Sequence, residues 1–189
     1  MTVRVMLISP AHSGALREAR FDDDGPLDEA GTHRAARAAD AVPGADRLLT
    51  APDTRCRQTA AALGLRAEPE PAVRAWDLGR WRGSTLADVT EEEPDAVAAW
   101  LADPAAAPHG GESLHALRER TGGWLEGLTD GGGRVLAVTD PAVVRAAVLY
   151  ALALPADAFW RLDAAPLTLT ELSGRAGRWN LRIGRPLEP

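Results

Sequence analysis

Short apolar runs alternate along the chain with longer segments of helical character. The apolar runs predict buried strands at residues 3–8, 47–51, 66–68 and 135–139. The segments between them predict helices at residues 28–41, 52–63, 113–128 and 141–152. This alternation predicts a three-layer α/β/α fold, in which a mostly parallel sheet is flanked by helices.

The stretch from residue 70 to residue 108 has the least regular pattern. It contains Trp76, Trp81 and Trp100, and it ends in a turn-rich segment that continues to Gly111. Two short helices are predicted inside it, at residues 84–91 and 94–101.

The end of the chain predicts a hairpin of two strands, at residues 167–172 and 179–183, with a turn at 174–177. We find no internal repeat and no linker long enough to divide the chain. We therefore expect a single domain over residues 1–189.

Composition agrees with a compact domain. With 189 residues, of which 46% are hydrophobic and 25% charged, the chain can bury a substantial core. The formal net charge is -6, and every basic residue is an arginine, which argues against a broad nucleic-acid surface. A local anion site remains open, built from the arginines Arg55, Arg57, Arg66 and Arg74.

No pattern in the sequence indicates export or a membrane span. The single cysteine, Cys56, allows no internal disulfide, and the first residues lack the pattern of a signal peptide. No apolar run approaches the ~20 residues that a spanning helix needs. We expect a cytoplasmic protein with no membrane partner and no nucleic-acid partner.

Three segments carry a resemblance to a known family: Leu27–Gly31, Ala51–Ala60 and Gly110–Ser113. In order and spacing they resemble the histidine phosphatase superfamily, also called the phosphoglycerate mutase-like family. The resemblance covers nearly the whole chain. It implies the same three-layer fold, with residues 70–108 as an insertion that shapes the substrate entrance.

The chain departs from the family pattern where the nucleophile is expected. In the family, the first strand ends in Arg-His-Gly, whose histidine attacks the phosphoryl group. Here that place reads Ser9-Pro10-Ala11, and counting on without a gap brings Arg20-Phe21 onto the family's usual Arg-Phe. The resemblance therefore implies that Pro10 occupies the position of the nucleophile.

Two further catalytic positions of the family differ in this chain. A later strand of the family ends in Ser-His-Gly, and the matching segment here is Thr139-Asp140-Pro141, so a carboxylate replaces an imidazole. The family's proton donor matches Ala75. Of the residues at the centre of the family's pocket, the resemblance leaves only Arg55.

These replacements argue against phosphoryl transfer through a phosphohistidine. That chemistry needs a nucleophile with a free lone pair, cationic groups around the phosphoryl oxygens and an acid for the leaving group. Proline has no such lone pair, and loss of a nucleophile commonly costs on the order of a million-fold in turnover. An added carboxylate also repels a phosphate.

Ligand sites in parallel α/β sheets lie beyond the carboxyl ends of the strands. The segments Ser9-Pro10-Ala11 and Thr139-Asp140-Pro141 both follow predicted strands. We therefore expect the ligand crevice of the family to persist here with a different lining. The expected lining residues are Ser9, His12, Arg55, Asp77, Glu112 and Asp140.

His12 and Asp140 are the candidate catalytic residues if the protein is an enzyme. His12 lies two positions beyond Pro10 and is either a general base or a loop histidine. Asp140 either orients a bound group or caps the helix that begins at Pro141.

Ser9, Arg55, Asp77 and Glu112 are the candidate ligand-binding residues. Arg55 suits an anion, and the alternative is a salt bridge between Arg55 and Asp140. Asp77 either replaces the missing acid or is an exposed loop aspartate, with the second favoured.

The resemblance gives Glu112 a supporting role. We expect Arg57, His109 and His115 at the surface. No ligand spacing points to a metal site, and no cofactor is expected.

Three functions remain open. The favoured one is a pseudophosphatase, which keeps the crevice for a small, anionic ligand or a partner without phosphohistidine chemistry. The second is a repurposed enzyme that uses His12 and Asp140 as an acid-base pair on a small metabolite. The third is a phosphatase or mutase with His12 as a displaced nucleophile. A homodimer is also open, because members of the family often dimerise.

Overall fold

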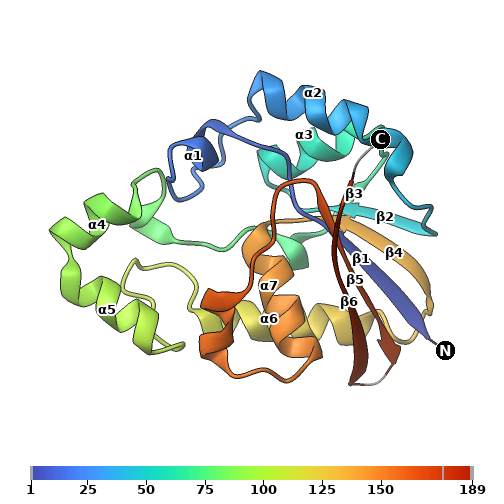
Figure 1. Ribbon diagram of the computed structural model, residues 1–189. Helices are drawn as coiled ribbons and strands as arrows, with labels where there is room; N and C mark the ends of the chain where they lie inside the picture. The colour runs from blue at the N-terminus through green and yellow to red at the C-terminus, as the bar shows by residue number, and fades with distance from the viewer. Residues whose placement is uncertain (1, 176, 188–189) are drawn as a thin grey trace.

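The centre of the molecule is a six-stranded sheet with the order β3-β2-β4-β1-β5-β6 (Figure 1). The computed structural model describes residues 2–175 and 177–187. The strands are β1 (Val3–Ile8), β2 (Arg47–Thr50), β3 (Glu68–Pro69), β4 (Gly133–Val138), β5 (Thr168–Arg175) and β6 (Arg178–Pro186).

The first four strands are parallel, and the last two are antiparallel to their neighbours. Val138 is in register with Ile8 on one side and with Thr50 on the other, so the carboxyl ends of β1, β2 and β4 lie at one level. The sheet is mixed but mostly parallel, which confirms the predicted α/β fold.

Helices cover both faces of the sheet. Figure 1 shows α2 and α3 on one face and α6 and α7 on the other, while α4 and α5 project from one end. The helices are α1 (Gly14–Arg17), α2 (Glu29–Arg37), α3 (Thr54–Ala62), α4 (Leu86–Glu92), α5 (Pro94–Ala102), α6 (Leu114–Gly127) and α7 (Pro141–Ala151). The 3-10 turns are η1 (Ala39–Ala41), η2 (Pro71–Val73), η3 (Gly79–Trp81) and η4 (Ala156–Arg161).

Side-chain caps explain where the main helices begin. Asp28, Ser113 and Asp140 each accept a hydrogen bond from a backbone N–H in the first turn of α2, α6 and α7. Thr85 forms a capping box with Asp88 at the start of α4. These caps satisfy N–H groups that have no partner within the helix.

Most predicted boundaries agree with the structure to within a few residues. The strand predicted at 66–68 is the two-residue β3, and Pro69 limits its pairing because it has no N–H. The helix predicted to reach Ala41 ends at Arg37 and continues only as the turn η1. The short elements α1 and η4 were not predicted from the pattern.

An aromatic cluster joins α5 to η4 and to the loops around them. Its ring centroids lie 4.7 to 6.4 Å apart, mostly in edge-to-face pairs, and its members are Phe21, Trp76, Trp81, Trp100, His109, Phe159 and Trp160. This cluster fixes the 70–108 segment against the rest of the chain.

The prediction that His109 lies at the surface is wrong. His109 is only 1% exposed, because its ring packs among the tryptophans. His115 is exposed, as predicted. His109 Nδ1 accepts a hydrogen bond from the Gly111 backbone N–H at 3.0 Å. Burial lowers the pKa of His109, so this ring is neutral where it serves as a core residue.

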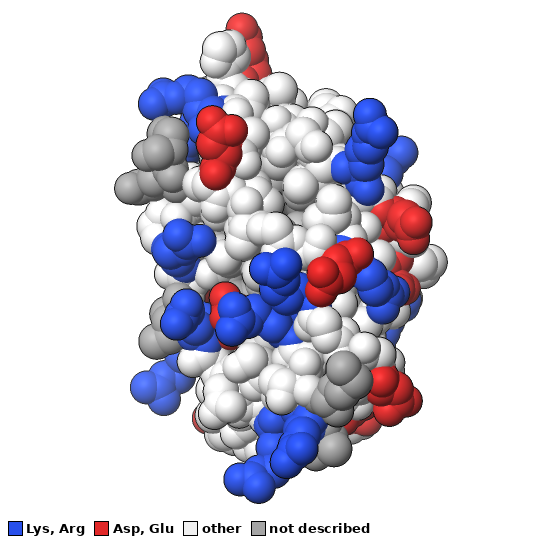
Figure 2. All heavy atoms as spheres, turned by 90° about the vertical axis from the view of Figure 1, so that its right-hand side faces the viewer, with Lys and Arg blue, Asp and Glu red and all other residues white. Residues whose placement is uncertain are grey.

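The opposite end of the sheet carries arginines. Figure 2 shows this side, where basic side chains stand out among fewer acidic ones. Arg4, Arg47 and Arg134 are exposed near the starts of β1, β2 and β4, and Arg4 pairs with Glu171 at 3.3 Å. Charge is therefore unevenly spread over a chain whose net charge is -6.

None of the helices in the described part of the chain combines the length and the apolar character needed to span a bilayer.

The packing of α6 on α7 gives a direct test of the fold. A Cβ atom at Gly122 would lie 2.2 Å from the Tyr150 ring, so Gly122→Ala is expected to destabilise the protein by about 1–3 kcal/mol. Gly123→Ala is the matched control, since a Cβ there meets nothing within 4 Å and should stabilise the helix by about 0.5–1 kcal/mol. Urea denaturation measures both. Equal effects of the two substitutions would contradict this packing.

Candidate functional site

The site forms where the parallel strands end. Ser9 follows β1, Asp53 lies just beyond β2, and Thr139 and Asp140 follow β4. Ser9 is 1% exposed, and its backbone is held by hydrogen bonds with Thr168 and Leu167, each 3.1 Å long. The strand ends thus bring together segments that are more than forty residues apart in sequence.

Arg55 is the central cation of this site. It lies in the first turn of α3, and its residue surface is 7% exposed. Its Nη2 donates a hydrogen bond to Asp140 Oδ2, and its Nε lies 3.4 Å from Asp22 Oδ1. The predicted salt bridge between Arg55 and Asp140 is therefore present, and a second carboxylate lies beside it.

Asp140 uses both of its carboxylate oxygens within the protein. Oδ1 accepts a hydrogen bond of 2.7 Å from the Ala142 backbone N–H, which caps α7, and Oδ2 accepts from Arg55. The predicted cap is thus present together with the ion pair. This arrangement fixes Arg55 to the start of α7.

Sequence reasoning missed two carboxylates, Asp22 and Asp53. Burial raises the pKa of Asp22 to about 6, and the nearby negative charges of Asp140 and Asp53 raise it further, against the opposing effect of Arg55. Burial also raises the pKa of Asp53, which accepts a hydrogen bond of 2.8 Å from the Ala75 backbone N–H. Two carboxylates, Asp140 and Asp22, are therefore paired with one buried guanidinium, and the negative charge of Asp53 also acts on it by raising the pKa of Arg55.

A cavity of about 200 Å³ opens beside these carboxylates. Its lining is polar and of both signs, and consists of Asp22, Asp53, Arg74, Ala75, Trp76, Asp77 and Arg82. Trp76 is held in the wall by a hydrogen bond of 2.7 Å from its Nε1 to the Glu112 carbonyl. Of the predicted site residues, Asp77 lines this cavity, and it is exposed there.

Glu112 lies behind the cavity wall. Its carboxylate receives two hydrogen bonds from Arg120, of 2.8 and 2.7 Å, and lies 3.6 Å from Arg74 Nη2. Arg120 also donates to the carbonyls of Ala72 and Arg74. Glu112 thus positions the segment that carries Arg74, which is the kind of role that the resemblance implied.

His12 lies apart from the Arg55 ion pairs. Its carbonyl accepts from the Asp28 backbone N–H at 3.2 Å, and it contacts the start of α2 closely enough that a Cβ at Gly31 would lie 2.3 Å from the His12 carbonyl oxygen. Burial lowers the pKa of His12, and the positive charges of Arg34 and Arg17 lower it further.

His12 and Asp140 do not form the pair that the sequence suggested. Within residues 2–175 and 177–187, no hydrogen bond or ion pair joins the two, and Nδ1 of His12 is buried without a hydrogen-bond partner. Both oxygens of Asp140 are engaged elsewhere. Direct proton exchange between these two groups therefore has no basis in this arrangement.

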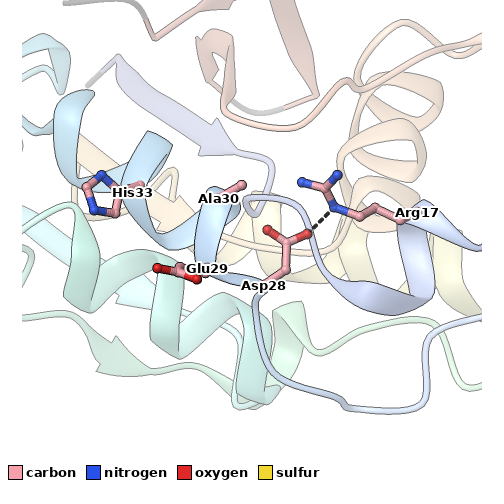
Figure 3. A pocket seen from close by; sticks show the side chains of 5 residues that line it. All are labelled: Arg17, Asp28, Glu29, Ala30 and His33. Atoms are coloured by element: carbon pink, nitrogen blue, oxygen red, sulfur yellow. Dashed lines mark hydrogen bonds and ion pairs between the residues drawn. The ribbon is translucent and has the colours of Figure 1, made fainter.

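A separate surface hollow lies at the start of α2. It has a volume of about 440 Å³ and is lined by Arg17, Asp28, Glu29, Ala30 and His33. Figure 3 shows Arg17 and Asp28 joined to one another across it, with His33 farther along α2. Arg17 and Asp28 are ion-paired with each other, so their charges are not available to a ligand, and this hollow does not extend the crevice.

The four arginines suggested as an anion site do not gather. Arg57 is on the exposed side of α3, as predicted, and Arg66 lies with Arg47 in another hollow at the edge of β2 and β3. Arg74 lines the crevice, whereas Arg55 is buried in ion pairs. Among the described residues, no cluster of three or more His, Cys, Asp or Glu is placed to hold a metal ion.

A family model described as the histidine phosphatase superfamily (branch 1) matches residues 14–183. The chain belongs to this superfamily. The matched residues include Arg55, Asp140 and the whole lining of the crevice, and they begin after the Ser9-Pro10-Ala11 segment.

Several of its relatives are named as phosphatases. The chain is 28% identical to a glucosyl-3-phosphoglycerate phosphatase of Mycolicibacterium vanbaalenii over 201 aligned positions, which cover 89% of this chain and 88% of that protein. The fold of this chain is similar to the native structure of mycobacterial glucosyl-3-phosphoglycerate phosphatase Rv2419c. The TM-score is 0.83 and the identity 25%, and the match covers 97% of this chain and 98% of that one. A putative alpha-ribazole-5'-P phosphatase of Escherichia coli has the same fold, with a TM-score of 0.87, 19% identity and coverage of 98% and 97%.

The raised pKa of Asp22 makes a prediction about stability. Asp22 in the unfolded chain titrates near 3.8, so the folded state binds its proton more tightly between about pH 4 and pH 6. Its contribution to stability is greatest below pH 4 and is lost as the pH rises through 6. Asp22→Asn should therefore stabilise the protein at pH 7.5 by roughly 1–2 kcal/mol, or about 2–8 °C in Tm, and not at pH 4.

Thermal denaturation at the two pH values measures this effect. Asp23→Asn is the matched control, because Asp23 is the neighbouring residue, is exposed, and lies outside the crevice lining. A loss of stability in Asp22→Asn at pH 7.5 would contradict the prediction, since the attraction of Asp22 to Arg55 would then outweigh the cost of burying its charge.

Proposed function

We propose that this protein is a degenerate histidine phosphatase that keeps a ligand crevice but does not carry out phosphohistidine chemistry. The observation that carries the proposal is the state of Arg55, which is buried and ion-paired with Asp140 and Asp22. In a phosphatase pocket, an arginine must be free to hold the phosphoryl oxygens.

The electrostatics of the crevice oppose a phosphate. Asp22, Asp53 and Asp140 surround one guanidinium, so the site has excess negative charge when all three are ionised. Two like charges about 4 Å apart repel by roughly 4 kcal/mol at an effective dielectric constant near 20. A dianionic phosphate would have to displace Asp140 from Arg55 and meet these carboxylates in the same step.

The position of Pro10 supports the same proposal. Pro10 directly follows Ser9 at the carboxyl end of β1, where the resemblance puts the attacking histidine of the family. A proline ring offers no lone pair for attack. His12 is a poor displaced nucleophile, since its charged neighbours are Arg17, Arg34 and Asp28 rather than Arg55.

One observation favours a second function, that of a repurposed acid-base enzyme. Asp22 has a pKa of about 6 and lines the cavity, so it changes protonation close to neutral pH. Groups with this property serve as general acids or bases in many active sites. In this version the acid-base group is Asp22, in place of His12 and Asp140.

Phosphate release tests the proposed function. The purified protein is incubated with p-nitrophenyl phosphate, 3-phosphoglycerate and glucosyl-3-phosphoglycerate, and inorganic phosphate is measured. We expect no release above that of the buffer. Robust turnover that is abolished by His12→Ala would contradict the proposal and support a displaced nucleophile.

A restored variant serves as the positive control. Ser9→Arg, Pro10→His and Asp140→His together return the family's residues and remove the carboxylate that binds Arg55. This variant should gain thermal stability in the presence of phosphate or vanadate, while the natural sequence should not. Equal shifts in both proteins would mean that Arg55 is already free to bind an anion.

A further inference from the structure

The crevice wall carries charges of both signs. Asp22 and Asp53 come from loops at its Arg55 side, and both are partly or largely removed from water. Arg74 and Arg82 are exposed and line the same cavity. A ligand of this cavity therefore meets carboxylates and guanidinium groups together.

Two buried polar atoms at the carboxylate side lack hydrogen bonds. Within the described residues, neither Arg55 Nε nor Asp22 Oδ1 has a hydrogen-bond partner, although the two atoms lie 3.4 Å apart. The Arg55 side chain is 9% exposed and the Asp22 side chain 16%. These two atoms face each other as an ion pair and are closed to the cavity, so a ligand in the cavity can reach only the other carboxylate oxygen of Asp22, Oδ2, for which no hydrogen bond is found within the described residues.

Charge decides which kind of donor fits. Four charged groups act on Asp22. Arg55 in α3 is positive, whereas Asp140 at the start of α7, Asp53 at the start of α3 and Asp24 in the same loop as Asp22 are negative. One positive charge thus stands against four carboxylates. An added ammonium group would reduce this repulsion, whereas an added anion would increase it.

Arg74 and Arg82 supply the positive charges of the lining. Arg82 is exposed, and Arg74 has one distant ion-pair contact, 3.6 Å from Glu112. Each can hold an acidic group by a charge-assisted hydrogen bond. The cavity volume of about 200 Å³ admits a small molecule.

We propose that this cavity binds a small zwitterion, with the ligand's ammonium group at Asp22 and Asp53 and its acidic group at Arg74 and Arg82. The inference rests on the proposed function, because a site that holds phosphate esters would need Arg55 free of Asp140 and Asp22. It goes further by naming the class of ligand.

Three probes of matched chain length test this inference by titration calorimetry at pH 7.5. They are 4-aminobutanoate, which has both charges, n-butylamine, which has only the ammonium group, and butyrate, which has only the acid. We expect 4-aminobutanoate to bind about two- to fivefold more tightly than n-butylamine, the effect of one exposed ion pair, and butyrate not to bind.

Two variants separate the two ends of the ligand. Asp22→Asn should weaken 4-aminobutanoate binding about tenfold, whereas the neighbouring control Asp23→Asn should change it less than about twofold. Arg82→Gln should remove the preference for 4-aminobutanoate over n-butylamine. Both variants replace side chains that keep contact with solvent, so the fold is expected to persist.

The pH dependence gives a further readout. With a pKa of about 6, Asp22 is mostly protonated at pH 5, so 4-aminobutanoate should bind about tenfold more weakly at pH 5 than at pH 7.5. Equal affinity for 4-aminobutanoate and n-butylamine, tighter binding of butyrate, or undiminished binding by Asp22→Asn would overturn the inference.

Failure of the inference and failure of the proposed function are distinguishable. Hydrolysis of phosphate esters would overturn the proposed function. Absence of both hydrolysis and zwitterion binding would overturn the inference alone.

Discussion

The structure of this site depends on one buried positive charge, that of Arg55. A guanidinium removed from water must be paired, and the pairing here comes from Asp140 and Asp22. Asp140 is itself fixed, because it caps α7 through its other oxygen. The ion pair therefore joins the start of α3 to the start of α7 across the ends of β2 and β4.

This constraint separates the fold from the chemistry of the family. The chain belongs to the histidine phosphatase superfamily and has its sheet, its helices and a crevice at the carboxyl ends of the strands. We propose that this crevice differs from that of a phosphatase in its charge, because its arginine is ion-paired within the protein and further carboxylates lie beside it. The fold alone does not fix which ligand such a pocket takes.

The regular elements could be predicted because buried strands and capped helices leave a local pattern in sequence. The ion pair between Arg55 and Asp140 could also be predicted, since the family alignment brought both residues to the pocket and their opposite charges favour pairing. Asp22 was missed because a loop brings it to Arg55 from a distant part of the sequence, and no local pattern encodes that approach. Asp53 lies only two residues before Arg55, but it was assigned only to the start of the helix predicted at 52–63. His109 was misplaced because it sits among turn residues, although tertiary packing with the tryptophans buries it.

A double-mutant cycle on Arg55→Gln and Asp140→Asn tests the central claim most directly, by measuring the free energy of unfolding of the four proteins at pH 7. Each single substitution should cost about 3–5 kcal/mol, because it leaves a buried charge unpaired. The double variant should cost about 1–3 kcal/mol less than the sum of the two single losses. Additive effects, within about 0.5 kcal/mol, would contradict the account, since Arg55 would then be free of Asp140 in solution.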